Sequence, residues 1–158
     1  MMGTASLALR RYDLPRKSYE TAIALDPDYV LALVNLGVTL SLMGHFIKAI
    51  THYQAGLKID PNDINSINAM GNALQFKGEY DAAIESYSKA IALAPTCAEA
   101  HNNLGNASEN QGNLQAAVKS YTQALVYQPE NEATQNNLIR ACQQLGVTDS
   151  TKDRTDRP

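Results

Sequence analysis

Cysteine is scarce in this chain of 158 residues, and the scarcity excludes two kinds of site. Its two cysteines, Cys97 and Cys142, form no CxxC motif and have no cluster of histidines beside them. Zinc sites and thioredoxin-like redox pairs need closely spaced thiol or imidazole ligands, so neither is expected. We interpret both thiols as small buried apolar side chains.

Basic residues are also few. The 13 lysines and arginines are outnumbered by 16 aspartates and glutamates, which gives a net charge of −3 and an isoelectric point near 5.5. Three of the basic residues, Lys152, Arg154 and Arg157, fall at the very end of the chain. Because no basic face remains to follow the phosphates of a nucleic acid, neither DNA nor RNA is an expected partner.

Apolar stretches are short, well below the roughly 20 residues that a transmembrane helix needs. The opening residues, MMGTASLAL, have neither the basic segment nor the cleavage motif of a secretory signal ahead of Arg10 and Arg11. We therefore expect no membrane insertion, and a cytoplasmic location is the default prediction.

Glycines, tyrosines and prolines recur along the chain at a constant interval of 34 residues. Four such series run through it. Their members are Gly3, Gly37, Gly71 and Gly105; Gly44, Gly78, Gly112 and Gly146; Tyr19, Tyr53, Tyr87 and Tyr121; and Pro27, Pro61, Pro95 and Pro129. A fixed period of this length is the signature of a repeat array, whose units bury their apolar faces against one another.

Each series has a physical reason to recur. The first glycine series would let a neighbouring helix approach closely, a gain that must offset about 1 kcal/mol of helix propensity. The second follows the first helix of each unit, where a left-handed residue can cap the C-terminus. The prolines end the second helices, because proline disfavours helical geometry in the residue before it. Each unit is therefore predicted to be an antiparallel helix pair.

This unit resembles the tetratricopeptide (TPR) repeat, which has Leu-Gly in its first helix, small and aromatic residues in its second, and a closing proline. Besides the tyrosines and prolines, the matching residues are Leu36-Gly37, Met70-Gly71, Leu104-Gly105, Ala49, Ala83 and Ala117. The chain departs from the family at Leu33, Ile67 and His101, where tryptophan is common, and at Gly56, where alanine is common. The resemblance implies an all-α fold, a right-handed TPR alpha-alpha superhelix of stacked helix pairs.

The same resemblance divides the chain into segments. These are an N-terminal half-repeat over 1–29, repeats over 30–63, 64–97 and 98–131, a capping helix over 132–146 and a disordered tail over 147–158. In the half-repeat we expect the tail of a first helix and then a complete second helix from about residue 13 to 25. Asp13 would be its N-cap, and Pro15 would be tolerated in its first turn. The incomplete first pair would leave that end of the stack partly uncovered.

Residues 100 to 107, AHNNLGNA, hold three asparagines, which a helical wheel places on one stripe apart from the packing residues. The TPR resemblance implies that first helices line a concave groove and that this stripe faces the ligand. Extended to the equivalent columns, the predicted ligand-binding set is Asn35, Asn68, Asn72, Asn102, Asn103, Asn106, Asn136, Asn137 and Arg140. A carboxamide has donors and acceptors, so it can pair with both N–H and C=O of an extended peptide. Apolar contact would come from Val34, Val38, Leu42 and Phe76.

Phrases such as NNLGNA resemble the TPR superhelix of the peptide O-GlcNAc transferases and their bacterial relatives, in the array only. Two other interpretations of the asparagines stay open: solvated groove residues, and hydrogen bonds between repeats. TPR domains that bind the C-terminal carboxylate of heat-shock chaperones use a Lys/Arg clamp in these columns. Here the clamp positions hold Val34, Asn68, Asn102 and Asn136, so a chaperone-tail receptor is disfavoured.

Enzyme signatures do not accompany the repeats. His45, His52 and His101 have no ligand-spaced partner, and the sequence has no nucleophile elbow, P-loop or dinucleotide fingerprint. We therefore expect a non-catalytic protein–protein interaction module, without cofactor or metal, that holds an extended peptide or partner helix in an asparagine-lined groove. The alternatives are a self-assembling scaffold, which forms a homo-oligomer through the open N-terminal end, and the substrate-recognition fragment of a larger enzyme such as a glycosyltransferase.

Overall fold

The computed structural model describes residues 3 to 146, with side chains from residue 12 onward, so the predicted tail at 147–158 lies outside the described residues. Within that range the chain is all α-helical, which confirms the predicted fold class. The helices are α1 (Gly3–Leu25), α2 (Val30–Leu42), α3 (Phe46–Ile59), α4 (Ile64–Lys77), α5 (Tyr80–Leu93), α6 (Ala98–Asn110), α7 (Leu114–Tyr127) and α8 (Glu132–Gln144). They form two compact units that divide after Ala94.

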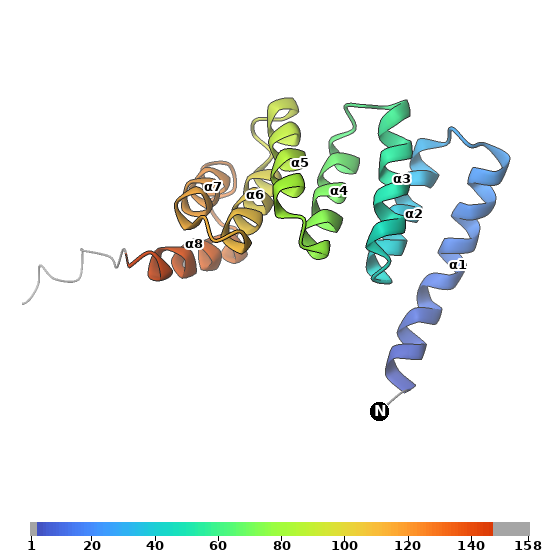
Figure 1. Ribbon diagram of the computed structural model, residues 1–158, viewed down its shortest axis with the longest axis horizontal. Coiled ribbons are helices and arrows are strands. Elements are labelled where there is room, and N and C mark those ends of the chain that lie inside the picture. The colour runs from blue at the N-terminus through green and yellow to red at the C-terminus, as the bar shows by residue number, and fades with distance from the viewer. Residues whose placement is uncertain (1–2, 147–158) are drawn as a thin grey trace, which may run out of the picture. The chain divides into compact units, whose positions relative to one another are not determined.

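In the first unit, α1 to α5 pack in chain order, each helix against the next, as Figure 1 shows. Helix α2 also touches α4, so the first helices of successive pairs form a common layer. The core is a cluster of buried side chains from α2, α3 and α4: Leu36, Leu40, Ala49, Tyr53 and Ala73. Tyr19 and Ile23 of α1 pack against this cluster, which anchors the C-terminal half of α1.

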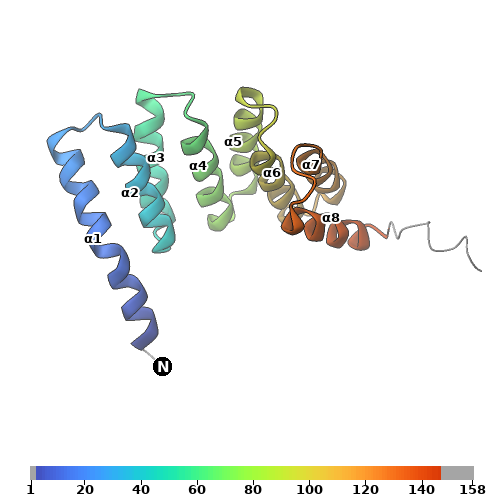
Figure 2. The ribbon, with the colours of Figure 1, turned by 180° about the vertical axis from the view of Figure 1, so that it is seen from behind.

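In the second unit, α7 packs between α6 and α8, and α6 also touches α8 (Figure 2). Its core is built on Ala117, Tyr121 and Ala141, with Val118 and Leu138 against them. Side-chain caps start two of the three helices: the side chain of Asn113 accepts from the Ala116 N–H, and that of Asn131 accepts from the Thr134 N–H. Both bonds satisfy backbone donors that a helix start leaves open.

The turns within the pairs confirm the role predicted for the second glycine series. Gly44, Gly78, Gly112 and Gly146 all have positive φ, between 73° and 88°. Residues with a side chain rarely adopt this left-handed geometry, so glycine follows the end of each first helix. The Asp60-Pro61 and Ala94-Pro95 steps likewise lie just past the ends of α3 and α5, as predicted.

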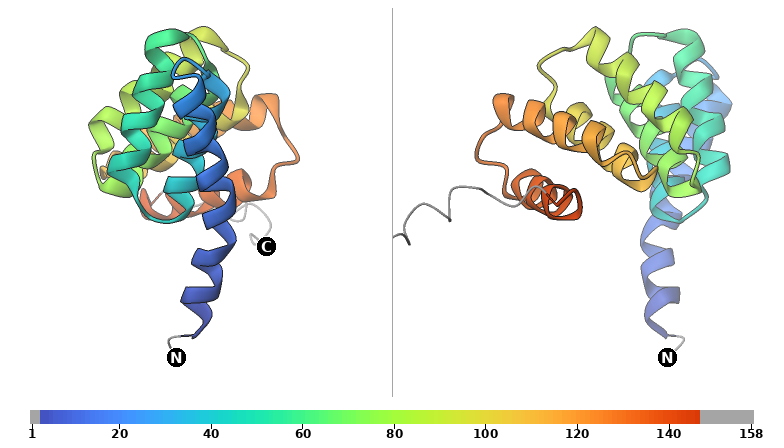
Figure 3. Two further views of the ribbon diagram at one scale, coloured as in Figure 1. Left: turned by 90° about the vertical axis from the view of Figure 1, so that its right-hand side faces the viewer. Right: turned by 60° about the vertical axis from the view of Figure 1, so that its left-hand side comes forward.

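Helix α1 corrects one prediction. Residues 3 to 25 form a single helix with Pro15 in its interior, in place of a second helix that begins near residue 13. The turn glycines stand at positions 44, 78 and 112, and one period earlier the chain has Arg10. Without glycine the left-handed turn is unfavourable, so the helix continues and Asp13 is not an N-cap. Figure 3 shows the first turns of α1 extending beyond α2 and α3.

The first glycine series has the packing role that the sequence predicts. A Cβ atom added to Gly37, Gly71 or Gly105 would lie 2.5 to 2.6 Å from Cε1 of Tyr53, Tyr87 or Tyr121 respectively. Each tyrosine comes from the second helix of the same pair and is at most 1% exposed. Glycine in the first helix therefore makes room for the aromatic ring that holds the pair together.

Candidate functional site

A groove of about 470 Å³ lies between α2, the start of α3 and α4. This volume is in the range of about 300–1,000 Å³ that is usual for ligand-binding clefts. Its lining residues include Val38, Ser41, Leu42, Phe46, Tyr53, Ala69, Asn72, Ala73 and Phe76. Three of the side chains expected to offer apolar contact line this groove, and they are exposed: Val38 by 39%, Leu42 by 61% and Phe76 by 75%.

Two stacked phenylalanines form one wall of the groove. The rings of Phe46 and Phe76 are 5.3 Å apart between centroids and nearly parallel, at 7°. The sequence reading missed Phe46, because it belongs to a second helix. A signal was nevertheless present: one and two periods later the chain has Tyr80 and Leu114, so a large apolar residue opens each second helix. Phe46 is half-buried against the core, and Phe76, 75% exposed, leaves an aromatic surface that gains free energy when a partner covers it.

Two of the helices that flank the groove, α2 and α4, are almost uncharged, whereas α3 carries Lys48, His52 and Lys58. Helix α2 contains no ionisable residue, and α4 contains only Lys77. The ammonium group of Lys77 lies 2.6 Å from a carboxylate oxygen of Glu79, so its charge is locally balanced. The sides of the groove formed by α2 and α4 therefore suit apolar and neutral polar groups.

The predicted amides of the first unit differ in what they expose. Asn72, at the edge of the groove, lies 2.6 Å from the hydroxyl of Tyr87, which is also 3.2 Å from the side chain of Gln75. Asn35 on α2 is half-buried. Asn68 is only 6% exposed, so it offers a partner little surface. The structure thus brings one of these three side chains, Asn72, to the groove.

The amides of the second unit contact one another across α6 and α8. The carboxamide of Asn137 lies 3.2 Å from that of Asn106 and 3.3 Å from that of Asn102. The hydroxyl of Thr134 lies 3.1 Å from the Asn102 carboxamide. These are hydrogen bonds between repeats, one of the two other interpretations of the asparagines that the sequence left open. They restrict the rotation of each carboxamide. All three side chains remain half-buried.

The other predicted ligand-binding residues of this unit lie beside these three amides. Asn103 is half-buried, and its carboxamide is 3.5 Å from that of Asn102. Asn136 is exposed on α8. Arg140 is bound by Glu109 through two bonds, from Nε to Oε1 at 2.8 Å and from its terminal nitrogen to Oε2 at 2.9 Å. Its charge is therefore partnered within the chain.

Glu109 is the one acidic residue of this network, and the sequence reading missed it. The equivalent positions of the preceding pairs hold Ser41 and Gln75, so no pattern marked a carboxylate. Hydrogen bonds from Arg140 hold the pKa of Glu109 below its usual range. The Tyr121 hydroxyl lies 2.7 Å from Glu109 Oε2, and burial raises the pKa of that phenol further than the bond to Glu109 does.

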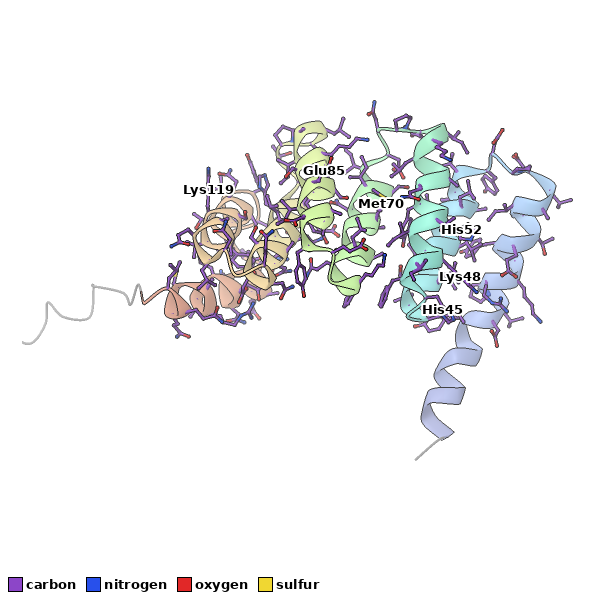
Figure 4. The ribbon with its side chains drawn as sticks, viewed as in Figure 1. His45, Lys48, His52, Met70, Glu85 and Lys119 are labelled. Atoms are coloured by element: carbon purple, nitrogen blue, oxygen red, sulfur yellow. The ribbon has the colours of Figure 1, made fainter. Side chains whose placement is uncertain are left out.

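The remaining candidates for chemistry are separate from one another. His101 is buried, with Nε2 2.9 Å from the Pro95 carbonyl oxygen and its ring against Tyr127. His45 and His52 both belong to the α3 region (Figure 4), and burial lowers the pKa of His52. Among the described residues, no group of three or more His, Cys, Asp or Glu side chains could hold a metal ion.

The cysteines correct a second prediction. Cys97 and Cys142 are half-buried rather than buried, and no disulfide links them. Cys97 precedes the first turn of α6, where a side chain keeps some contact with water, and Cys142 lies on the terminal helix α8. In the part of the chain that the structure covers, no helix combines the length and the apolar character that crossing a bilayer requires.

Comparison with known families identifies the repeat. Residues 18–51 and 52–85 match a family described as tetratricopeptide repeat, residues 98–131 match a second family of the same description, and residues 76–112 match one described as TPR repeat. The chain belongs to the TPR family. The narrower resemblance to O-GlcNAc transferase arrays stays a prediction.

Several solved structures share the fold. Two crystal structures of MamA are 23% identical to this TPR chain and cover 93% of it, with 87% and 85% of their own lengths matched and TM-scores of 0.81 and 0.76. The first TPR of Spaghetti (RPAP3), bound to the HSP90 peptide SRMEEVD, is 25% identical and has a TM-score of 0.72. That match covers 74% of this chain and 93% of the other. No curated protein sequence matches this chain significantly.

Proposed function

We propose that this chain is a non-catalytic protein–protein interaction module that holds an extended peptide or a partner helix on the first helices of its repeats. Membership of the TPR family supports this function, as does a TPR neighbour that was solved with a bound peptide. The observation that carries the proposal is the groove of about 470 Å³, whose wall, an exposed Phe76 stacked on a half-buried Phe46, fits an apolar side chain of a partner.

The binding mechanism combines this apolar groove with amides. An apolar anchor of the partner enters between Leu42 and Phe76, which releases water from both surfaces and supplies most of the affinity. Asn72 at the groove edge, together with Asn35, forms hydrogen bonds with the partner's backbone. These bonds do not depend on the partner's side chains. In the second unit, the amides of α6 and α8 do the same. The module is therefore expected to tolerate many sequences around one apolar anchor.

A chaperone tail is a less suitable ligand. The peptide in the Spaghetti (RPAP3) complex, SRMEEVD, carries three acidic residues. In this chain the four clamp columns hold Val34, Asn68, Asn102 and Asn136, none of which is basic. Arg140 is the cation nearest to those columns on α8, and both of its short bonds go to Glu109. An acidic tail would therefore gain little from ion pairing here.

The test uses the full chain as bait in a lysate of its source cells, with captured proteins identified by mass spectrometry and then titrated as purified proteins. The Leu42→Ala/Phe76→Ala double variant removes groove side chains that are mostly exposed, so the fold should persist. We expect at least tenfold weaker binding, which corresponds to about 1.4 kcal/mol. Val126→Ala is the matched control, because Val126 is 65% exposed on α7 and outside the groove. A partner that binds the native chain, the double variant and the control variant equally would exclude the groove as the binding site.

A second candidate function, self-assembly through the N-terminal end, is favoured by α1. Leu14 and Leu25 of this helix are 78% and 83% exposed, which leaves apolar surface at the start of the stack. Sedimentation velocity over a hundredfold range of concentration tests it. We expect the sedimentation coefficient to rise with concentration for the native chain and to stay constant for Leu14→Glu. A native chain that remains monomeric throughout would rule the scaffold out.

A further inference from the structure

The hydroxyl of Tyr121 lies between two acceptors. It is 2.8 Å from the carboxamide of Asn106 and 2.7 Å from Oε2 of Glu109, so both contacts have the length of a hydrogen bond. A phenol carries one proton, and it can therefore donate to only one of these neighbours. The other contact is favourable only if that neighbour donates to the phenol oxygen.

The proton of Tyr121 goes to Glu109. Two short bonds from Arg140 keep this carboxylate ionised, and an ionised carboxylate has no proton to donate. A hydrogen bond to a charged acceptor is roughly twice as strong as one between neutral groups. The 2.8 Å contact between Tyr121 and Asn106 is then favourable only if the side-chain nitrogen of Asn106 donates to the phenol oxygen.

The orientation of the Asn106 carboxamide determines the orientation of the amides in contact with it. The two ends of a carboxamide have nearly the same shape, so the hydrogen bonds decide which end is nitrogen. With the nitrogen of Asn106 facing Tyr121, the Asn137 atom 3.2 Å away must be oxygen. That oxygen also accepts from Asn102, 3.3 Å away, whose second N–H reaches the hydroxyl of Thr134 at 3.1 Å. In this arrangement each N–H of Asn106 and Asn102 has its own acceptor.

We propose that Glu109 is a positioning residue that fixes the polarity of the amide surface on α6 and α8. A partner then meets the free carbonyl oxygen of Asn106 and the free NH2 group of Asn137, whereas the carbonyl end of Asn102 faces the carboxamide of Asn103, 3.5 Å away. This surface fits an extended peptide backbone that donates an N–H group to Asn106 of α6 and offers a carbonyl to Asn137 of α8. The assignment of a peptide partner rests on the proposed function, whereas the orientation of the amides does not.

Side-chain amide exchange, measured by NMR on the labelled full chain without any partner, tests the orientation. We expect the NH2 protons of Asn106 to exchange with water at least tenfold more slowly than those of Asn137, because only the former are bonded within the network. A nuclear Overhauser effect should also join the Asn106 NH2 group to the ring of Tyr121. Slow exchange at Asn137 with fast exchange at Asn106, or equal rates at both, would overturn the proposal.

Two variants separate positioning from simple structural support. In Glu109→Gln the new amide can either donate to Tyr121 or accept from it, so the direction is no longer imposed, and the difference between Asn106 and Asn137 should fall below threefold. Glu99→Gln, an exposed carboxylate on the same helix, is the control and should leave the difference unchanged. Unchanged exchange in Glu109→Gln would contradict the role of Glu109. Because no ligand is present, a failure here leaves the proposed function to its own test.

Discussion

Single contacts decide which residue types the repeat can accept. Tyr53, Tyr87 and Tyr121 are the largest fully buried side chains, and each fills the space above a glycine of the facing helix. The tyrosine hydroxyl then reaches the first helix again, at Ser41, Gln75 or Glu109. One aromatic residue in each pair thus links the apolar core to the polar stripe.

Gly105→Ala tests this close packing. The new methyl group would lie 2.5 Å from Cε1 of Tyr121, whose ring is fully buried and cannot move aside. We expect the variant to lose about 1–3 kcal/mol in the free energy of unfolding, measured by urea denaturation.

Gly56→Ala is the matched control for that measurement. Gly56 also lies inside a helix, but its added methyl group would be 3.5 Å from the nearest atom, Cγ2 of Val34, which is ordinary contact. We expect it to gain up to about 1 kcal/mol, because alanine is the better helix former. Equal effects of the two substitutions would show that helix propensity, and not the tyrosine ring, decides the result.

The Glu109–Arg140 pair should make stability depend on pH. The pKa of Glu109 is lower in the folded than in the unfolded chain, so its ionised form adds stability at neutral pH. That stability is lost as the pH falls from about 4.3 through the folded pKa. We expect Glu109→Gln to unfold about 1 kcal/mol more easily at pH 7, since half of Arg140 is exposed, and to approach the native chain in acid. Urea denaturation across this pH range measures the gap, and a gap independent of pH would refute the ionic origin.

At the level of helices, α1 shows how one missing glycine changes an element. The repeat predicts a turn near position 10, and the chain has Arg10 there. The resulting continuous helix contains Pro15, which deprives the preceding turn of one backbone hydrogen bond. A helix that began near residue 13 would lose nothing, because its first turn has no such bond to make.

Pro15→Ala distinguishes these two forms of the N-terminal region. In the continuous helix alanine restores the missing bond, and we expect a stabilisation of up to about 3 kcal/mol together with more helix by circular dichroism. In a helix that starts near residue 13, the same change would remove a favourable first-turn proline and leave helix content unchanged. Thermal unfolding with circular dichroism at 222 nm separates the outcomes.

Across the chain, stability should follow the number of neighbours that each helix has. In the first unit α3 packs between α2 and α4, whereas α1 has α2 as its helix neighbour. In the second unit α7 is covered on two sides and α8 on one. Arrays of repeats gain their stability from such interfaces, so end helices open more easily than inner ones.

Native-state hydrogen exchange measured by mass spectrometry checks this expectation. We predict faster amide exchange in α1 than in α3, and faster exchange in α8 than in α7, by at least tenfold at neutral pH. Each comparison is made between two helices of the same unit. Uniform protection throughout the described helices would indicate a chain that opens only as a whole.

Much of this architecture could be read from local patterns. The 34-residue period, the turn glycines and the closing prolines predicted the helix pairs, because each acts on its own backbone. The buried tyrosines followed from the same register. The candidate site was harder to predict from the sequence. The asparagine stripe could be recognised, but the stacking of Phe46 on Phe76 joins two different helix pairs, so no local sequence pattern predicts it.

The amides show what could not be predicted from the sequence alone. Its register placed Asn102, Asn106 and Asn137 on equivalent faces of first helices, which is a property of spacing alone. Their contacts join residues 31 and 35 positions apart, and the bonds around Glu109 decide which atom of each amide is free. Helix type and register follow from interactions a few residues long, whereas the direction of a hydrogen-bond network depends on every group that it touches, and folding alone brings those groups together.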